Sequence, residues 1–325
     1  MFVLNSILSE RYPTVMDGLI YTYPFDGEKH CCVTNLKYAK ILIINSGSNN
    51  LYNFFQSKGS FLTTVTLNLE NEDIQASEGQ YNLIAIDSGD KEISEDILNK
   101  IKEFSNNIKT SVYIFCLNNL NILYNYGGSC VYIDSKVKED VIKDIITKSS
   151  LYNSLYNATL LDSCIELDNG YMELPWDNRI DNFSICFDLE IDNYKNNINL
   201  IGIKNNSTLL MGIYFNLSQG KIEIQSDNIN SIKYDILKNI NLFSSKNKIS
   251  IIKQGYKFYI YCNDELCVSA NIEISTKGNS LIIGQYSLSN INNSSVIKIS
   301  NLSIYDKELS FKDIDILNKG RLIFL

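Results

Sequence analysis

Few residues in this chain have the types and spacing that catalysis requires. His30 is the only histidine among 325 residues, so a Ser-His-Asp or Cys-His arrangement would depend on that residue alone. It follows the first expected strand, and no nucleophile elbow accompanies it. We therefore interpret His30 as a surface residue at a junction between two parts of the chain.

The carboxylates also lack the pattern of a glycosidase. Jelly-roll glycoside hydrolases need two carboxylates across a cleft, often as E-x-D-x-x-E on one strand, and this array does not occur in the sequence. Glu223 and Glu273 each stand between two isoleucines, which favours the solvent face of an alternating strand. The sequence thus predicts a non-enzymatic protein, and a glycosidase or another hydrolase is kept as an alternative.

Eight cysteines invite a metal or disulfide interpretation. Cys116, Cys130, Cys164 and Cys186 occur in apolar runs, where cysteine behaves as a small buried hydrophobe. Cys262 and Cys267 are spaced more widely than the tightest zinc knuckles, and Cys31 directly precedes Cys32. We expect reduced thiols and no metal on the cysteines.

Polar loops follow three apolar runs between residues 36 and 157. They supply the candidate ligand positions Ser46, Gly47, Asp87 and Asn118. The loop after residue 45 has a single glycine and no phosphate-binding motif. Asp87 stands where a receiver-like domain has its phosphoacceptor, but the first loop offers no partner acids for Mg²⁺. This region is expected to make protein contacts rather than to perform a reaction.

Residues 36–157 alternate between strand and helix patterns. Strands are expected at 40–45, 61–67, 83–86, 112–117 and 130–133, and the helices include 49–58 and one that begins near Ser94. Such alternation predicts a small doubly wound α/β domain with mostly parallel strands. Residues 1–17 form a short arm, in which a helix with one apolar face would end before Pro13. This arm must dock on its own body or on a neighbouring subunit.

A different pattern begins near residue 158. Short alternating strands are separated by turns rich in Asn, Asp, Ser and Gly, and no helix is expected before Ser310. The expected strands are 183–191, 200–204, 210–217, 221–225, 248–253, 257–262, 266–272, 280–284 and 296–305. This pattern is typical of an antiparallel β-sandwich.

Several segments resemble laminin-G-like, concanavalin A-like jelly-roll domains, and they occur in the order found in those domains. The segments are 168–175, 183–189, 259–266, 279–284 and 299–310. Residues 18–27 match the opening strand pattern G-L-x-x-Y-x-P-F-D-G of these families. The resemblance therefore implies a discontinuous sandwich made of 18–35 and 158–325, interrupted by the α/β domain at 36–157. Phe187 departs from the pattern, because tryptophan is frequent at that place in the family.

The resemblance implies two kinds of binding site. Laminin-G-like domains often hold calcium at the rim, and Asp168, Asn169 and Asp264 are turn residues of the right type. Turn-forming Asn and Asp also occur without a metal, so both interpretations stay open. No other cofactor is expected. The candidate sugar-stacking residues are Trp176, Tyr171, Tyr214, Tyr256 and Tyr286.

Charge and composition limit the partners. The net charge is −8 and no long basic run is present, so nucleic-acid binding is not expected. No apolar run could cross a bilayer, and no secretory signal opens the chain. Frequent Asn, Ile and Lys resemble the products of AT-rich bacterial or phage genomes.

These observations favour a structural subunit of a phage tail, fibre, baseplate or tail-like bacteriocin. Such a protein is made in the bacterial cytoplasm and released by lysis in a virion or tail-like particle. We expect it to form a homo-oligomer or to contact other particle subunits, and to bind a cell-surface glycan. A capsid decoration or other purely structural virion protein is the alternative.

Overall fold

The computed structural model describes the chain in separate stretches. They are residues 18–23, 32–33, 37, 39–45, 50–66, 81–89, 96, 99–101, 103, 112–116, 130–132, 155–161, 163–193, 197–216, 219–226, 229–235, 246–284 and 296–319. The predicted docking arm at residues 1–17 lies outside them. The chain divides into two compact units, which are considered one at a time. The first comprises Met1–Thr34, Leu155–Glu173 and Asn178–Leu325, and the second comprises Asn35–Ser154 and Leu174–Asp177.

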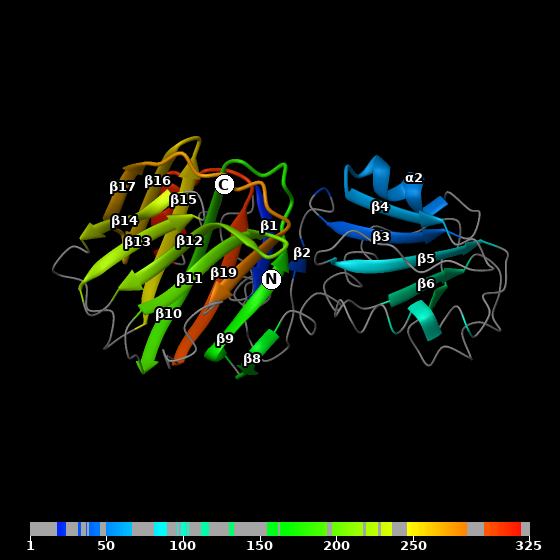
Figure 1. The fold of residues 1–325 in the computed structure, drawn as a ribbon, viewed down its shortest axis with the longest axis horizontal. Helices are drawn as coiled ribbons and strands as arrows, with labels where there is room; N and C mark the ends of the chain where they lie inside the picture. Colours follow the sequence, from blue (N-terminus) through cyan, green and yellow to red (C-terminus); the bar gives the residue numbers. More distant parts are fainter. Residues whose placement is uncertain are drawn as a thin grey trace, which may run out of the picture. The chain divides into compact units, whose positions relative to one another are not determined.

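The first unit is built from one long antiparallel sheet (Figure 1). Its strands are β1 (Leu19–Tyr23), β2 (Cys32–Val33), β8 (Leu155–Leu160), β9 (Ile165–Pro175), β10 (Phe183–Asn193), β11 (Asn197–Asn205), β12 (Thr208–Asn216), β13 (Lys221–Ser226), β14 (Ile229–Asp235), β15 (Asn247–Gln254), β16 (Lys257–Cys262), β17 (Glu265–Asn271), β18 (Ser280–Gly284) and β19 (Val296–Tyr305). The main path runs β14-β13-β12-β11-β18-β9-β19-β10-β15-β16-β17. Outside this path, β1 pairs with β19 and β2, and β8 pairs with β9.

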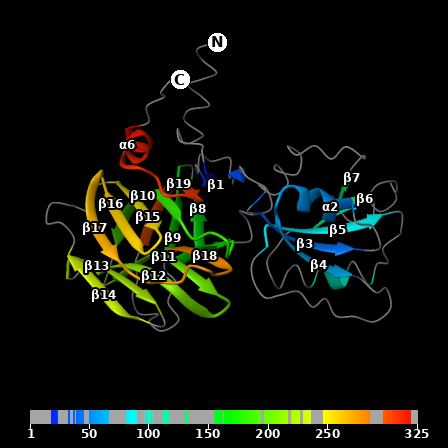
Figure 2. The ribbon, with the colours of Figure 1, turned by 90° about the horizontal axis from the view of Figure 1, so that it is seen from above.

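The sheet folds over into two layers, with β11–β14 in one and β10 and β15–β17 in the other (Figure 2). Alternate side chains of each layer point inward, as the period of two requires. Ile213, Phe215 and Ile222 come from the first layer, and Phe183 and Ile185 come from the second; all are fully buried. This apolar interior holds the two layers together, and each layer keeps an outer face.

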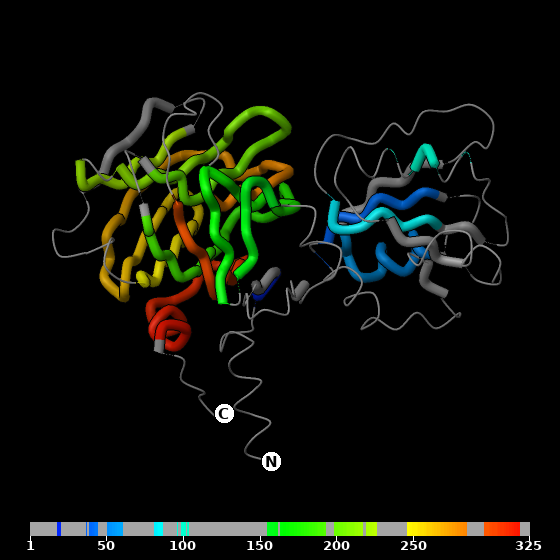
Figure 3. Tube along the Cα trace, turned by 90° about the horizontal axis from the view of Figure 1, so that it is seen from below, coloured from blue at the N-terminus to red at the C-terminus, as the bar shows by residue number. Residues whose placement is uncertain are grey.

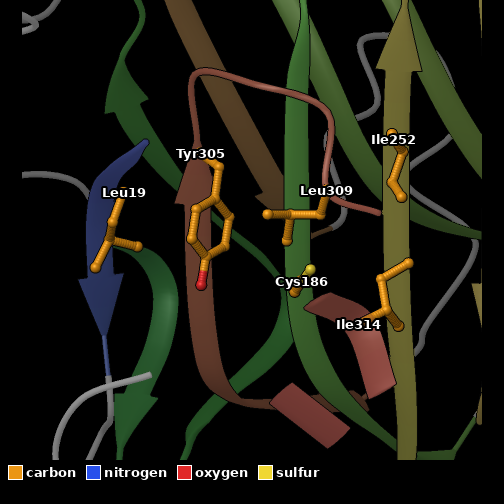
Figure 4. Packing of buried hydrophobic residues seen from close by; sticks show 6 residues of the cluster. All are labelled: Leu19, Cys186, Ile252, Tyr305, Leu309 and Ile314. Atoms are coloured by element: carbon orange, nitrogen blue, oxygen red, sulfur yellow. The ribbon is translucent and has the colours of Figure 1, made fainter. Parts of the chain in front are cut away.

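The outer face of the second layer is covered by the helix α6 (Phe311–Lys319), which follows β19 (Figure 3). Leu309 and Ile314 contact an apolar cluster with Leu19 on β1, Cys186 on β10, Ile252 on β15 and Tyr305 on β19 (Figure 4). At the start of the helix, Ser310 Oγ accepts a hydrogen bond from the Asp313 backbone N–H at 3.2 Å. The Asp313 carboxylate accepts one from the Ser310 N–H at 2.9 Å, which completes a capping box.

The second unit contains a five-stranded sheet in the order β4-β3-β5-β6-β7, and every described pairing in it is parallel. The strands are β3 (Lys40–Asn45), β4 (Phe61–Thr66), β5 (Leu83–Gly89), β6 (Val112–Cys116) and β7 (Cys130–Tyr132), and the helix α2 spans Asn50–Ser57. Ile41, Ile43, Leu83 and Ile84 are fully buried, as the continuous apolar runs predict.

A mostly antiparallel, jelly-roll-like β fold is therefore confirmed, and most strand bounds agree with the sequence to within three residues. β8 and β14 were not predicted. Their sequences, LYNATL and INSIKYD, mix polar and apolar residues without a clean alternation. An inserted doubly wound domain stays a prediction, because α2 is the one helix of the second unit whose bounds the structure describes.

Candidate functional site

Two stacked tyrosines lie at one edge of the β-sandwich. Tyr156 on β8 pairs with Tyr171 on β9, and the ring centroids are 4.4 Å apart with an angle of 17° between the rings. Both side chains are half-buried. Burial, together with the nearby Glu173 carboxylate, raises the pKa of Tyr156, so its hydroxyl stays protonated and can donate a hydrogen bond.

Two glycines allow the close packing around Tyr171. A Cβ on Gly170 would lie 2.2 Å from the Asn157 carbonyl oxygen, and one on Gly284 would lie 2.8 Å from the Gly170 carbonyl oxygen. Gly284 also has a φ of +104°, which favours glycine. β8, β9 and β18 therefore approach closely here, and this approach fixes the position of the tyrosine pair.

An ion pair lies next to the tyrosines. Glu173 on β9 contacts Lys204 on β11 at 2.8 Å, and their side chains are 6% and 15% exposed. Strand β18 lies between β9 and β11, and Lys204 pairs with Ser280 of β18. The long lysine side chain therefore extends across β18 to reach Glu173. A buried carboxylate of this kind needs its partner, because removing one charge leaves the other without compensation.

A second cluster occupies β12 and β13. Tyr214 pairs with Glu223, and the Asn216 side-chain amide donates a hydrogen bond to Glu223 Oε1 at 2.8 Å. Glu223 and Asn216 are buried. The ring of Tyr214 lies over Gly212, because a Cβ built on Gly212 would come within 2.6–2.9 Å of three ring and hydroxyl atoms. Tyr214 thus lies along the strand and is half-buried.

These side chains share one side of the sheet. Residues 211, 213, 215, 222 and 224 point into the core, so Tyr214, Asn216 and Glu223 point outward. Gly202 pairs with Gly212, and Lys204 is two residues from Gly202, which places Lys204 and its partner Glu173 on the same side. We call this surface the polar face, and its members are Tyr156, Tyr171, Glu173, Lys204, Tyr214, Asn216 and Glu223.

The spacing of the polar face matters for its chemistry. Tyr171 and Tyr214 are separated by three strand spacings, or about 14 Å. Glu173 and Glu223 are separated by four, or about 19 Å. Glycosidase carboxylates lie roughly 5–9.5 Å apart, so these two acids cannot serve together as such a pair. Aromatic rings with amide and carboxylate groups between them suit the hydrogen-bonding and stacking of a polyhydroxylated ligand.

The predicted sugar-stacking residues lie in different places. Tyr171 and Tyr214 belong to the polar face. Tyr256 is 65% exposed in the turn between β15 and β16, away from these strands. Trp176 is 1% exposed, which leaves no ring face for a sugar. Tyr286 lies outside the described residues.

The three calcium candidates are not brought together. Asp168 and Asn169 are exposed on β9, and Asp264 lies in the turn after β16, four strand spacings away at about 19 Å. Asp264 accepts a hydrogen bond from the Asn318 side chain of α6. One ion cannot be held by all three, and within the described stretches no cluster of three acidic, histidine or cysteine side chains has the geometry of a metal site. Calcium binding at Asp168 and Asn169 alone stays a prediction.

Of the candidate ligand positions in residues 36–157, Asp87 lies within β5, where it pairs with Asn45 and Phe115. Ser46, Gly47 and Asn118 lie outside the described residues, as does His30. In the described parts of the chain, no helix is long and apolar enough to span a membrane.

Sequence reasoning missed Tyr156, Glu173, Lys204 and Asn216. The alternation Tyr171-Met172-Glu173 was a usable signal, since it places a tyrosine and an acid on one side of β9. Glu223 lies on the outer side of β13, as the alternation predicts, but it is only 4% exposed, and its carboxylate accepts a hydrogen bond from the Asn216 side chain. Glu273, treated in the same way, is exposed as predicted.

Comparisons with known proteins identify no family for this chain. No family model and no curated protein matches the sequence. Among solved structures, Trypanosoma rangeli sialidase in complex with sialic acid is 13% identical and has a TM-score of 0.43. The match covers 54% of this chain and 30% of the sialidase chain. A botulinum neurotoxin type C structure concerned with two ganglioside molecules is 18% identical with a TM-score of 0.41, covering 53% and 47%.

The serotype D neurotoxin ligand binding domain in complex with N-acetylneuraminic acid is similar to the same degree, at 18% identity and a TM-score of 0.40. The match covers 52% of this chain and 47% of the neurotoxin chain. The chain thus spans less than half the length of each of these structures. At such TM-scores the likeness carries no argument about function, and the proposals below rest on the residues of this chain.

Proposed function

We propose that the protein is a non-enzymatic carbohydrate-binding subunit and that a glycan lies across the polar face between Tyr171 and Tyr214. One observation carries this proposal: a half-buried tyrosine lies over a glycine next to a hydrogen-bonded carboxylate–amide pair. Sugars present apolar C–H faces and rims of hydroxyls, so a ring and a nearby polar pair can engage both.

Each group has a distinct part in this proposal. Gly212 lets the Tyr214 ring lie along the sheet, which is the orientation that stacking against a sugar ring needs. Glu223 and Asn216 hold each other in one geometry, which lowers the entropy lost when they bind hydroxyls. Glu173 and Lys204 lie between the tyrosines and are fixed by their ion pair.

The biological setting is part of the same proposal. The sequence resemblance and composition support a phage tail, fibre or baseplate protein, or a tail-like bacteriocin subunit, released by lysis and assembled with copies of itself or other subunits. In that setting the polar face would attach the particle to a cell-surface glycan. Calcium at Asp168 and Asn169 would be an addition to this site rather than a part of it.

A glycan array and a pull-down with bacterial cell-wall polysaccharide test the proposal. The wild-type chain is expected to bind, and Tyr214→Ala is expected to weaken binding about tenfold because a stacking surface is lost. Tyr256→Ala is the matched control, since it removes a more exposed tyrosine from a different part of the sheet. Equal losses in both variants, or no binding by the wild type, would refute the polar face as the site.

Electron microscopy of purified particles tests the setting separately. A label on this chain at a tail tip, fibre or baseplate agrees with the proposal, whereas a label over the capsid surface supports a decoration protein. Absence of the chain from particles would refute the particle role. Glycan binding would then be tested by the array alone.

A further inference from the structure

Two cysteines that the glycan proposal does not use lie in contact at the far end of the sheet. Cys262 is the last residue of β16 and is fully buried, and Cys267 on the neighbouring strand β17 is half-buried. Neither is in a disulfide. β17 ends the main path of the sheet, so the hairpin that carries both residues forms an edge.

The strand register explains how two residues five apart in sequence meet. Cys262 pairs with Glu265 and Tyr261 pairs with Leu266, but Ile260 pairs with Val268. Cys267 is therefore the extra residue of a β-bulge, which turns its side chain out of the regular alternation. The Cys267 thiol donates a hydrogen bond to the Glu265 carbonyl oxygen at 3.5 Å, and it interacts with the Cys262 thiol across the bulge.

We propose that Cys262 and Cys267 are a redox modification site, which low-molecular-weight disulfides convert into a disulfide that closes the β16–β17 hairpin. The two thiols differ in a way that assigns their roles. The interaction with Cys262 lowers the pKa of Cys267, and Cys267 is also the more exposed of the two. The same interaction and burial raise the pKa of Cys262. Cys267 is thus the attacking thiol and Cys262 the resolving thiol.

The exchange balances in two steps. The Cys267 thiolate attacks one sulfur of the reagent disulfide, forms a mixed disulfide and releases one reagent thiolate. Cys262 then loses its proton and attacks the Cys267 sulfur, which forms the Cys262–Cys267 bond and expels the second reagent thiol. The protein loses two electrons, the reagent gains them, and the two thiol protons end on the two released reagent thiols.

Such a bond would act on the edge hairpin alone. It closes a short loop, and it joins two strands that the bulge leaves without regular pairing at that point. We expect oxidation to raise the Tm of the β-sandwich by roughly 2–4 °C. Glycan binding should not change, because the polar face belongs to β8, β9 and β11–β13.

The experiment treats the full reduced chain with glutathione disulfide and maps the peptides by mass spectrometry. The expected product is a 262–267 peptide that has lost two hydrogens. Cys267→Ser should leave Cys262 reduced, and Cys262→Ser should trap one glutathionyl group on Cys267. Cys164 is the matched control, because it is also half-buried and free but has no thiol partner among the described residues.

Two results would overturn the proposal. One is a stable mixed disulfide at Cys267 in the wild-type chain, which would mean that Cys262 cannot reach it. The other is an unmodified pair under conditions that modify Cys164. The Tm with and without dithiothreitol, measured on wild type and Cys262→Ser, provides a second readout: the shift should occur only in the wild type.

Discussion

The two outer faces of the β-sandwich differ in what covers them. On the second layer, α6 buries an apolar cluster that includes Tyr305 and Ile314. The polar face, on β8, β9 and β11–β13, consists of a stacked tyrosine pair, an ion pair, a carboxylate–amide pair and Tyr214. The outer surface of the same sheet is therefore covered by a helix in one region and formed by polar side chains in another.

This difference indicates where a ligand can bind. An apolar face that is covered by the chain's own helix stabilises the fold and has no free surface. A face whose members hold each other by hydrogen bonds keeps polar groups oriented, and its tyrosines remain half-buried rather than enclosed. The helix-covered face should therefore respond to substitution mainly through stability, and the polar face mainly through binding.

The largest expected effect is on the helix-covered face. Ile314→Ala removes a fully buried side chain from the contact between α6 and the sheet, and should lower the free energy of unfolding by about 3 kcal/mol. Urea denaturation measures the change. Phe311→Ala, on the same helix but 55% exposed, is the control and should cost well under 1 kcal/mol. Equal effects of both changes would mean that α6 is not held by its apolar side.

The next effect concerns the ion pair of the polar face. Glu173→Ala leaves the Lys204 ammonium, which is only 15% exposed, without its carboxylate and should cost about 2 kcal/mol. Asp192→Ala removes one of the two carboxylates that pair with the more exposed Lys298, leaves Glu166 in place, and should cost about 0.5 kcal/mol or less. Urea denaturation of both variants tests the difference. A Glu173 variant as stable as wild type would show that the pair does not hold the polar face.

The sequence predicted the β-sandwich well because its strands alternate cleanly. Lys257–Cys262 and Val296–Tyr305 were predicted with the bounds that the structure has, and Ser310 was predicted to precede a helix. Alternation is a local property, so each strand carries its own signal in five or six residues.

The site was predicted less well because burial depends on neighbours that are distant in sequence. Glu223 was assigned to the solvent face from its two flanking isoleucines, but it is buried there and accepts a hydrogen bond from Asn216 on the adjacent strand. Trp176 follows Pro175 like a loop residue, yet it is buried. The contact of Cys262 with Cys267 requires a bulge, and no residue of the hairpin indicates that bulge in the sequence.

A change at Gly212 separates ring orientation from ring chemistry on the polar face. Gly212→Ala would place a methyl group 2.6–2.9 Å from atoms of Tyr214, so the ring must move while its chemistry stays the same. Glycan affinity should fall by a factor of about three to ten, a loss of roughly 1 kcal/mol, and array titration measures it. Gly220→Ala adds the same methyl group where nothing lies within 4 Å but at a φ of +62°, so it controls for backbone strain without contact with Tyr214, and affinity should be retained. Unchanged affinity in Gly212→Ala would mean that the flat ring is not what a glycan contacts.

The smallest expected effect tests whether the two faces are independent. Ser310→Ala removes the hydroxyl that caps α6 and should lower the free energy of unfolding by about 1 kcal/mol or less. Ser269→Ala, at an exposed position on β17, is the control and should change it by less than about 0.5 kcal/mol. Because α6 packs on β1, β10, β15 and β19 whereas the polar face belongs to β8, β9 and β11–β13, the capping variant should bind glycan as the wild type does. A parallel loss of affinity would show that the helix-covered face also shapes the polar face, and the division of roles between them would fail.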